Sequence, residues 1–297
     1  MILKSAVPRL SGRWKAALTA AVVVALPTFV GISSVSSSRS GDASAAPRPA
    51  EIASALRNQE VACGASLELA YTDSWKRFDG GRVEEEAITT YRYTRTPDAF
   101  RVDVERDGRM IQQTFVDRDT NQCVQLDSPG SSQYAVLGKG LGSPFLNREF
   151  FETTRYLLGR EPLCERVESG VVSEQMEQID GHDCWRVEIP PDRLNLKRYV
   201  AWLDPSIGFN PRRIEYVWTD EVPDVITFAK YEEITGGFWF PKEMVLTYEW
   251  KSGNRTFRQV NKVDSITVGR VIPKEQLRLE VPSGMRVISN NREFTAP

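Results

Sequence analysis

The sequence predicts an α+β protein, mostly antiparallel β, with roughly ten strands in one large sheet and helices before and within the run of strands. From residue 66 onward, apolar residues recur at every second position, which is the period of a strand buried on one face. Short turns rich in Gly, Asp and Pro separate these runs, as in antiparallel hairpins. No alternation of strands with helices is visible, so a parallel sheet is not expected.

The N-terminal part is predicted to direct export. Four basic residues precede an uncharged run from Ala16 to Ile32. We interpret residues 1–32 as an export signal or an N-terminal membrane anchor, and residues 33–50 as a Ser/Ala/Pro-rich linker or cleavage region. Both alternatives export residues 51–297, the β domain, because positive charge stays inside. The domain is therefore expected in the periplasm or cell envelope, either soluble or tethered.

A short helix is expected over residues 49–62, because Ile52, Ala55 and Leu56 share one face and Gly64 follows. The first strands predicted from alternation are 66–71, 87–95, 99–106, 110–118 and 122–126. A glycine-rich segment (137–147) and an amphipathic helix (148–159) interrupt the sheet. The later strands are predicted at 165–179, 184–189, 198–203, 212–218, 225–234, 238–250 and 255–268.

The stretch "WLDPSIGFNPRRIEYVW" (202–218) is predicted to be a hairpin. Asp204 and Pro205 start a turn, and Gly208 permits a positive φ. Pro211 keeps the connection out of the hydrogen-bonded ladder. The motif therefore turns the chain and is not by itself a binding motif.

Composition excludes several kinds of function. The net charge of −2 gives no electrostatic reason to expect nucleic acid as a partner. His182 is the only histidine, so histidine-rich metal sites are excluded. Its position in "DGHDC" favours a turn residue, and no GxSxG motif supplies a nucleophile for it.

Two other stretches fail as catalytic or ligand motifs. "DRDTNQ" (117–122) begins like a calcium loop but has Gln122 and Ser128 where the loop needs Gly and Glu. "GKGLG" (138–142) lacks the GK[ST] of a phosphate loop. We expect no metal, no cofactor and no catalytic residue.

The four cysteines are Cys63, Cys123, Cys164 and Cys184. In an exported domain they are expected to form two disulfides, for which three pairings exist. Proximity along the chain favours Cys63 with Cys123 and Cys164 with Cys184. Four buried free thiols are the alternative, and a zinc site is disfavoured because no CxxC is present.

Aromatic and aliphatic residues alternate along several strands, and one face of the sheet must be apolar in any case. These rows are therefore either ordinary core or the wall of an apolar cavity. The candidate wall residues are Tyr91, Tyr93, Val102, Val104, Phe115, Tyr216, Trp218, Leu246, Tyr248 and Trp250. A lid is expected from the helix at 148–159, through Phe150, Phe151, Thr154, Leu157 and Leu158.

Two parts of the sequence carry a resemblance to a known family. One is "CWRVEI" after a D-G turn, and the other is the tail with "WLDPSIGFNPRRIEY", "YEEITGGFWFPKEMVLTYEW" and "VNKVDSITVGRVIPKEQLRLEVPSGMRVI". Together with the order of elements, they resemble the outer-membrane lipoprotein carrier (LolA-like) superfamily. The resemblance spans roughly residues 50 to 290 and consists of turns and strands, not of a catalytic signature. It implies an incomplete, half-open β-barrel whose concave apolar face is covered by helices.

The resemblance further implies a non-enzymatic binding protein for a lipid, an acylated peptide or lipoprotein, or another apolar ligand. The alternative is a cell-envelope sensor or scaffold that binds protein partners through the same fold. A hydrolase using carboxylates would need two of them converging in a cleft, which no spacing suggests.

Overall fold

The computed structural model describes residues 45–64, 66–120, 122–127, 134–139, 157–158, 161–191, 198–217, 223–249, 255–289 and 292–297. Ser44–Pro297 is one compact unit. The expected export segment (1–32) and most of the linker lie outside the described residues. Over the described ranges, no helix combines the length and the apolar composition needed to cross a membrane.

The helical elements are α1 (Pro49–Cys63), α2 (Leu163–Arg166) and the 3₁₀ turns η2 (Val167–Ser169), η3 (Pro205–Ile207) and η4 (Lys274–Gln276). The strands of the first half are β1 (Leu67–Asp79), β2 (Arg82–Arg95), β3 (Ala99–Arg106), β4 (Arg109–Asp117), β5 (Gln122–Asp127), β6 (Tyr134–Lys139), β7 (Leu157–Leu158) and β8 (Glu161–Pro162). The remaining strands are β9 (Val171–Ile179), β10 (His182–Ile189), β11 (Arg198–Asp204), β12 (Asn210–Val217), β13 (Asp224–Thr235), β14 (Phe238–Glu249), β15 (Arg255–Val268), β16 (Arg286–Ser289) and β17 (Arg292–Thr295).

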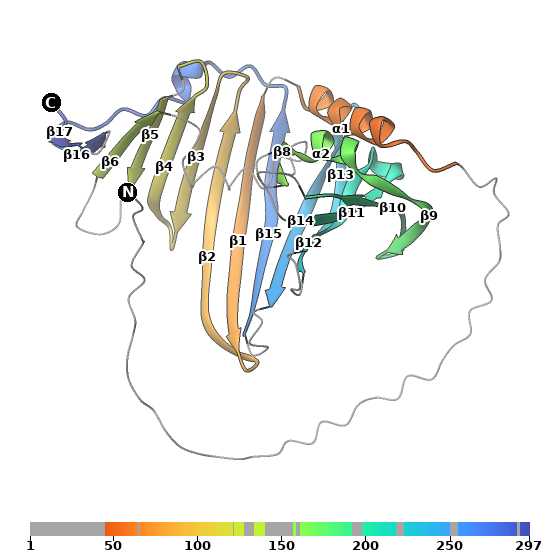
Figure 1. Ribbon diagram of the computed structural model, residues 1–297. Helices are drawn as coiled ribbons and strands as arrows, with labels where there is room; N and C mark the ends of the chain where they lie inside the picture. Colours follow the sequence, from red (N-terminus) through yellow and green to blue (C-terminus); the bar gives the residue numbers. More distant parts are fainter. Residues whose placement is uncertain are drawn as a thin grey trace, which may run out of the picture. The chain divides into compact units, whose positions relative to one another are not determined.

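Among the described residues, one open sheet of 15 strands dominates, in the order β17-β16-β6-β5-β4-β3-β2-β1-β15-β14-β13-β12-β11-β10-β9 (Figure 1). Its pairs are antiparallel except β16 with β6, which is parallel. The predicted mostly antiparallel β class is confirmed, and the open sheet is consistent with the predicted half-barrel, but the predicted number of strands is too low. The prediction misses β6, β16 and β17, because these strands of four to six residues contain no long alternating run.

Two predicted boundaries are wrong. The segment predicted as one strand over 165–179 begins with α2 and η2, and β9 starts only at Val171. Leu163, Cys164 and Val167 are buried at helical spacing, which explains why this part folds as a helix. Leu157 and Leu158 form β7, which pairs with β8, and not the end of a helix. Residues 148–156 of the predicted helix lie outside the described residues.

Helix α1 confirms the helix predicted over 49–62. Pro49 occupies its first turn, where a missing N–H costs nothing. The Glu51 carboxylate accepts hydrogen bonds from the backbone N–H of Arg48 (2.8 Å) and from its guanidinium (2.7 Å), which caps the N-terminus. Ile52 and Leu56 are buried against the sheet, so this face fixes the helix in place.

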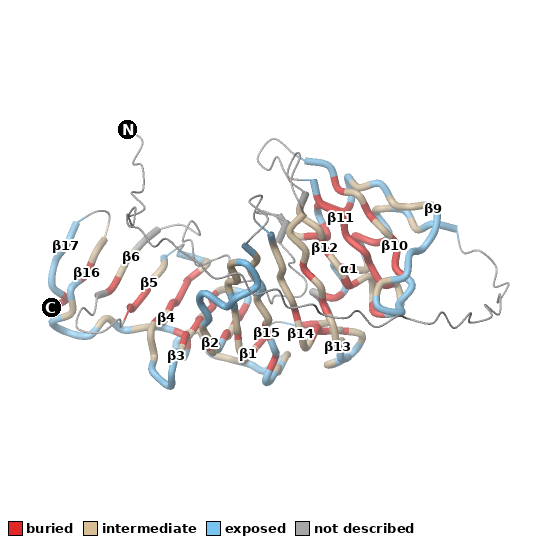
Figure 2. The backbone as a smooth tube through the Cα atoms, turned by 90° about the horizontal axis from the view of Figure 1, so that it is seen from below, coloured by how far each residue is buried: buried red, intermediate tan, exposed pale blue. Residues whose placement is uncertain are grey.

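The sheet has an inner face, which α1 packs against, and an outer face opposite it. The inner face carries the largest buried cluster, from Val116 on β4 to Val187 on β10. Figure 2 shows the buried residues along these strands. On the outer face of β3–β6 the C-terminal segment provides the cover, because Leu277 packs against Ala99 and Phe115. Both faces are therefore partly covered, by different segments of the chain.

Candidate functional site

Two rows of directly paired residues cross the inner face from β15 to β5, and we call them the inner rows. One row is Val263, Tyr71, Tyr91, Val104, Gln112 and Asp127. The other is Ile266, Leu69, Tyr93, Val102, Thr114 and Gln125. Both rows are aliphatic or aromatic from β15 to β3 and polar on β4 and β5, so the inner face has an apolar part and a polar end.

Four candidate wall residues lie in the apolar part of these rows: Tyr91, Tyr93, Val102 and Val104. All four are buried. The Tyr91 ring stacks on that of Tyr71, with centroids 4.8 Å apart and planes within 9° of parallel. Such aromatic pairs stabilise a sheet beyond the area they bury. Tyr71 was absent from the sequence candidates although its strand alternates.

The apolar surface continues on the other side of β15. Leu246 pairs with Ile226, and Ile226 pairs with Ile214 on β12. Tyr216 lies two positions after Ile214 on β12, so it faces the same side of the sheet. Its ring and that of Tyr199 form a T-shaped pair with centroids 5.1 Å apart. Burial raises the pKa of Tyr216, so the phenol stays neutral. Leu246 and Tyr216 therefore share the inner face with the four residues above.

The far ends of β1, β14 and β15 carry three stacked aromatic rings, which we call the far-end stack. Phe257 lies between Tyr248, at 4.8 Å, and Trp75, at 5.9 Å. Paired positions place all three rings on the inner face, and each is only half-buried. Tyr248 is a sequence candidate. Trp75 was missed because β1 extends to Asp79, beyond the strand predicted at 66–71. Phe257 lies in the strand predicted at 255–268 but is not among the candidate wall residues.

The far-end stack lies at the opposite end of β14 from α1. Gln59 of α1 accepts a hydrogen bond from the backbone N–H of Trp239 (2.9 Å) near the start of that strand. Tyr248 lies nine positions after Trp239, a distance of about 30 Å along a strand. The described helices therefore cover one end of the inner face and leave the end with these rings without a helix (Figure 1).

The other candidate residues do not join this surface. Phe115 lies on the outer face, packed against Leu277, because it alternates with the inward-facing Thr114 and Val116. Trp218 and Trp250 lie outside the described residues, as do Phe150, Phe151 and Thr154 of the expected lid. Leu157 and Leu158 lie in β7.

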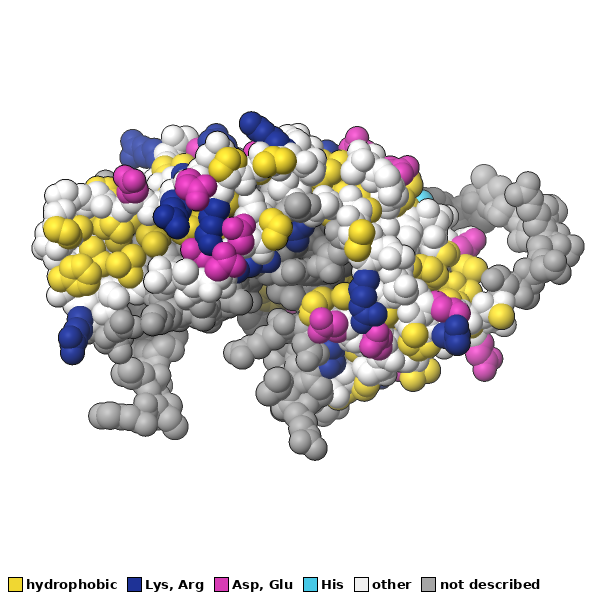
Figure 3. Space-filling model, turned by 90° about the horizontal axis from the view of Figure 1, so that it is seen from above, with side chains coloured by type: hydrophobic (Ala, Val, Ile, Leu, Met, Phe, Trp, Pro, Cys, Tyr) yellow, Lys and Arg dark blue, Asp and Glu magenta, His cyan; other side chains and the backbone are white. Residues whose placement is uncertain are grey.

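Charged side chains of both signs are interspersed on the face shown in Figure 3, between groups of hydrophobic side chains. No region of one sign dominates that view. The net charge of −2 likewise gives no electrostatic reason to expect a polyanionic partner.

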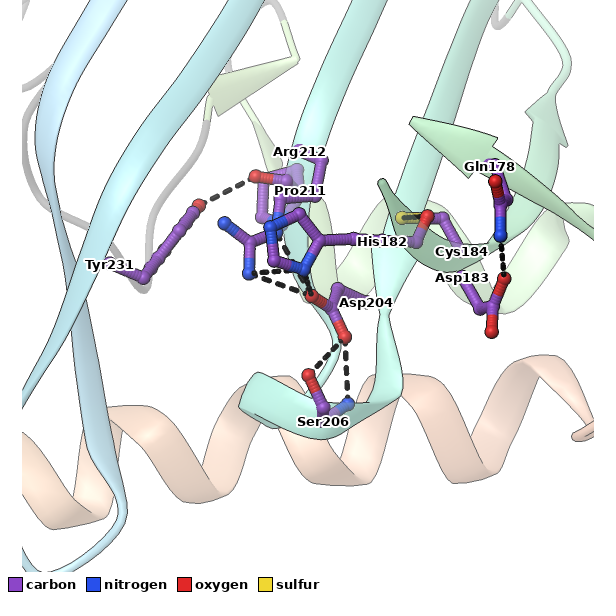
Figure 4. Close-up of polar contacts among 9 residues, drawn as sticks. All are labelled: Gln178, His182, Asp183, Cys184, Asp204, Ser206, Pro211, Arg212 and Tyr231. Carbon is purple, nitrogen blue, oxygen red and sulfur yellow. Dashed lines mark hydrogen bonds and ion pairs between the residues drawn. The ribbon is translucent and has the colours of Figure 1, made fainter. Parts of the chain in front are cut away.

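The turn at residues 204–212 is held by a buried ion pair (Figure 4). Asp204 Oδ2 accepts hydrogen bonds from Arg212 Nε (2.9 Å) and Nη2 (2.8 Å). Its Oδ1 accepts hydrogen bonds from the backbone N–H (2.8 Å) and the hydroxyl (2.6 Å) of Ser206. Asp204 thereby caps the N-terminus of η3. The Arg212 guanidinium also lies over the Tyr231 ring, 4.9 Å from its centroid. The arrangement confirms the predicted hairpin and gives it a structural reason. The prediction for Pro211 is wrong, because β12 begins at Asn210 and Pro211 pairs with Leu203 next to a shift in register.

His182 lies at the rim of this ion pair. Its Nδ1 is 3.7 Å from Asp204 Oδ2 and 3.4 Å from Arg212 Nη2 (Figure 4). The nearby Cys184 thiol is buried, and burial together with Asp204 raises its pKa to about 12. A thiol with that pKa is not a nucleophile at neutral pH. These contacts stabilise the hairpin and do not assemble a catalytic pair.

Gln59 connects α1 to two hairpin turns. Its amide Nε2 donates to the carbonyl of Gly237 (2.9 Å), and its Oε1 accepts from Asn210 Nδ2 (3.3 Å). Gly208 is close to this side chain and has φ of +69°, so a Cβ there would collide with the Gln59 amide. The glycine in the turn is thus required both by its backbone conformation and by the approach of α1.

A lysine from the C-terminal segment contacts the stretch at 117–122 that resembles a calcium loop. Lys274 Nζ lies 2.8 Å from Asp117 Oδ1 and 2.8 Å from Asp119 Oδ2. Asp117 Oδ1 also accepts the backbone N–H of Thr120 (3.1 Å). The ammonium therefore occupies the position between the carboxylates and fastens the C-terminal segment to the β4–β5 turn. Among the described residues, no cluster has the composition of a metal site.

We predict an acid-dependent effect of this contact. Lys274 holds the pKa of Asp117 at about 2, below its ordinary 3.8. A lowered pKa in the fold stabilises the protein above the ordinary pKa, and the contribution disappears as pH falls through about 2. Lys274→Met should therefore lower the thermal midpoint at pH 7, and its difference from the wild type should shrink between pH 4 and pH 2. A difference that is unchanged at pH 2 would contradict the assignment.

The two expected disulfides are not formed, and none of the four cysteines is in a disulfide. Cys63 ends α1 just before β1, whereas Cys123 lies on β5, with β2, β3 and β4 between them. Cys164 packs in the inner cluster, whereas Cys184 packs with Val200 and Trp202 in a separate one. Proximity along the chain failed as a guide because the strands carry sequence neighbours to different parts of the sheet.

No protein-family model matches the chain, and no curated protein matches it. Among solved structures, a DUF1329 family protein from Desulfovibrio piger has 14% identity and a TM-score of 0.49, covering 77% of this chain and 95% of that chain. A LolA superfamily protein from Nitrosomonas europaea has 13% identity and a TM-score of 0.47, covering 79% and 99%. A domain described as an outer-membrane lipoprotein-sorting protein, from Vibrio parahaemolyticus, has 16% identity and a TM-score of 0.45, covering 77% and 95%. The chain is thus similar to LolA superfamily structures, and at these identities the similarity concerns the fold alone.

Proposed function

We propose that the chain is an exported, non-enzymatic binding protein that holds an apolar ligand against the inner face of its open sheet. The ligand classes are a lipid, an acylated peptide or lipoprotein, or another molecule with a fatty chain. The observation that carries the proposal is the apolar part of the inner face, together with the half-buried stack of Trp75, Phe257 and Tyr248 beyond the reach of α1. On β1 the inward position between Tyr71 and Trp75 is the polar Asp73, so the apolar surface reaches the stack along β14, through Met244 and Leu246.

Elementary energetics support a fatty chain as the ligand. Burying a methylene group contributes about 0.8 kcal/mol, so a chain laid along the inner face gains affinity with each carbon. Aromatic rings in an open, half-buried position offer large contact area at low entropic cost. The proposed wall is Tyr91, Tyr93, Val102, Val104, Tyr216, Leu246 and Tyr248, with Tyr71, Trp75 and Phe257 added.

A protein partner is the second candidate, and β9 is the feature that favours it. This strand has one neighbour in the described sheet, and its Val171 and Met176 are exposed. An exposed edge strand is a template for a strand from another chain. Glu174 and Glu177 on the same strand oppose uncontrolled pairing, so a partner strand would need basic residues.

The proposal is tested by native mass spectrometry of the protein purified from the envelope of its host, followed by organic extraction. A lipid or acylated peptide that co-purifies in a fixed ratio is the expected result. A protein that carries no ligand, and that also fails to take up a fluorescent fatty-acid analogue, would contradict the proposal. Co-purification of a protein with an unliganded domain would favour the second candidate.

A further inference from the structure

The polar end of the inner rows contains a buried carboxylate. Asp127 on β5 is 8% exposed. Its Oδ1 accepts a hydrogen bond of 2.7 Å from Gln112 Nε2, and its Oδ2 accepts one of 2.7 Å from Gln125 Nε2. Each oxygen thus has one amide donor, and each retains a further lone pair. The carboxylate is fixed in position by two neutral side chains.

No described lysine or arginine forms an ion pair with Asp127. Asp103 on the outer face differs from Asp127 in having a cationic partner. Asp103 also accepts from a glutamine, Gln113 Nε2 at 3.0 Å, but its charge is matched by Arg101 Nε at 3.0 Å. Burying a carboxylate without a cation is costly, so an unmatched carboxylate on the inner face is a candidate for contact with a cationic ligand.

The position of Asp127 relates it to the proposed apolar site. Asp127 pairs with Gln112, Gln112 with Val104, and Val104 with Tyr91, so all four lie in one row on the inner face. Three strand spacings separate Asp127 from Tyr91, a distance of about 14 Å. An extended fatty chain is long enough to span this distance, with its head at Asp127 and its tail over the tyrosines.

We propose that Asp127 is the head-group subsite of the inner face and that it selects an amphiphile carrying an ammonium group. The ammonium donates hydrogen bonds to the free lone pairs of Asp127 and neutralises the buried charge. Gln112 and Gln125 hold the carboxylate in orientation, and the chain lies on Val104, Tyr91 and Tyr71. This inference rests on the proposed apolar-ligand function and specifies its ligand class.

The test uses three amphiphiles of equal chain length, dodecylamine, dodecanol and dodecanoate, each below its critical micelle concentration. Each displaces the apolar probe N-phenyl-1-naphthylamine from the full chain at pH 7. We expect dodecylamine to bind most tightly and dodecanoate most weakly. Asp127→Asn should weaken dodecylamine binding about ten- to a hundred-fold, the value of a hydrogen bond to a charged group, and leave dodecanol unchanged.

Asp103→Asn is the matched control, because it removes a glutamine-bonded carboxylate from the outer face of β3. It should leave all three affinities unchanged. Asp127→Asn should keep or raise the thermal midpoint, since it removes an unmatched buried charge. The Asn oxygen still accepts from one glutamine, and the other glutamine can turn its amide so that its oxygen accepts from the Asn NH2. A fall in midpoint with unchanged amphiphile preference would show a structural role and overturn the proposal.

Two outcomes separate this inference from the function on which it rests. If dodecanol and dodecylamine bind equally to both proteins, the ammonium subsite is wrong and the apolar site stands. If no amphiphile displaces the probe, the apolar site itself fails. If Asp127 does select the ammonium, the affinities for lysophosphatidylethanolamine and lysophosphatidylglycerol identify the source of that ammonium. A preference for the former that Asp127→Asn abolishes assigns it to a phospholipid head, and no preference between them assigns it to another amine.

Discussion

Asp204→Ala is expected to lower the free energy of unfolding by about 3–5 kcal/mol, the usual cost of removing one partner of a buried ion pair. The substitution leaves the buried Arg212 guanidinium without its carboxylate. It also removes the cap of η3, because Ser206 donates to the same carboxylate. Urea unfolding followed by circular dichroism measures the change.

Two controls define the origin of that loss. Replacing Asp204 and Arg212 together by apolar residues of similar size should cost less than the single alanine, because no unpaired charge remains. Lys76→Ala breaks an ion pair of similar length, 2.7 Å to Glu86, at an exposed position, and should change stability by less than about 1 kcal/mol. Equal losses at the buried and exposed pairs would refute the structural role given to Asp204.

Phe257→Glu is expected to reduce affinity for a fluorescent fatty-acid analogue by at least about tenfold, through loss of apolar contact and burial of a charge beside the chain. Phe257 is the middle ring of the far-end stack, so its removal separates Trp75 from Tyr248. Because the stack is only half-buried, the protein should remain folded. Fluorescence titration of the wild type and the variant measures the difference.

Thr256→Glu is the matched control for Phe257→Glu. It adds the same charge one position away, where alternation turns the side chain to the outer face. Affinity should be unchanged in this variant. If both variants lose affinity equally, the effect is one of net charge, and the far-end stack has no part in binding.

The hairpin and the wall residues show what alternation can predict. Tyr91, Tyr93, Val102 and Val104 lie where the two-residue period puts them, because strands β2 and β3 are regular and pair without a shift at these positions. The turn at Asp204 and Gly208 was also predictable, because its residues have specific backbone preferences. Phe115 failed because "QQTFVD" contains adjacent buried residues, so the period does not say which face each one occupies.

Other features depend on contacts between distant segments. Lys274 meets Asp117 and Asp119 more than 150 positions away, and no local pattern indicates that contact. Gln59 is unremarkable in the sequence of α1, yet it reaches Gly237 and Asn210. The burial of Asp127 likewise follows from the register of β4 and β5. Cysteine pairing failed for the same reason, since it depends on where the sheet carries each strand.

The most direct test of the central claim is to locate a bound fatty chain on the protein. A diazirine-bearing fatty acid would be bound, photolysed and mapped by peptide mass spectrometry, with unlabelled fatty acid as competitor. We expect competable labels on inner-face residues, at Tyr71, Tyr91 and the stack of Trp75, Phe257 and Tyr248. Competable labels confined to the outer-face cluster around Phe115 and Leu277, or labelling that the competitor does not reduce, would contradict the account.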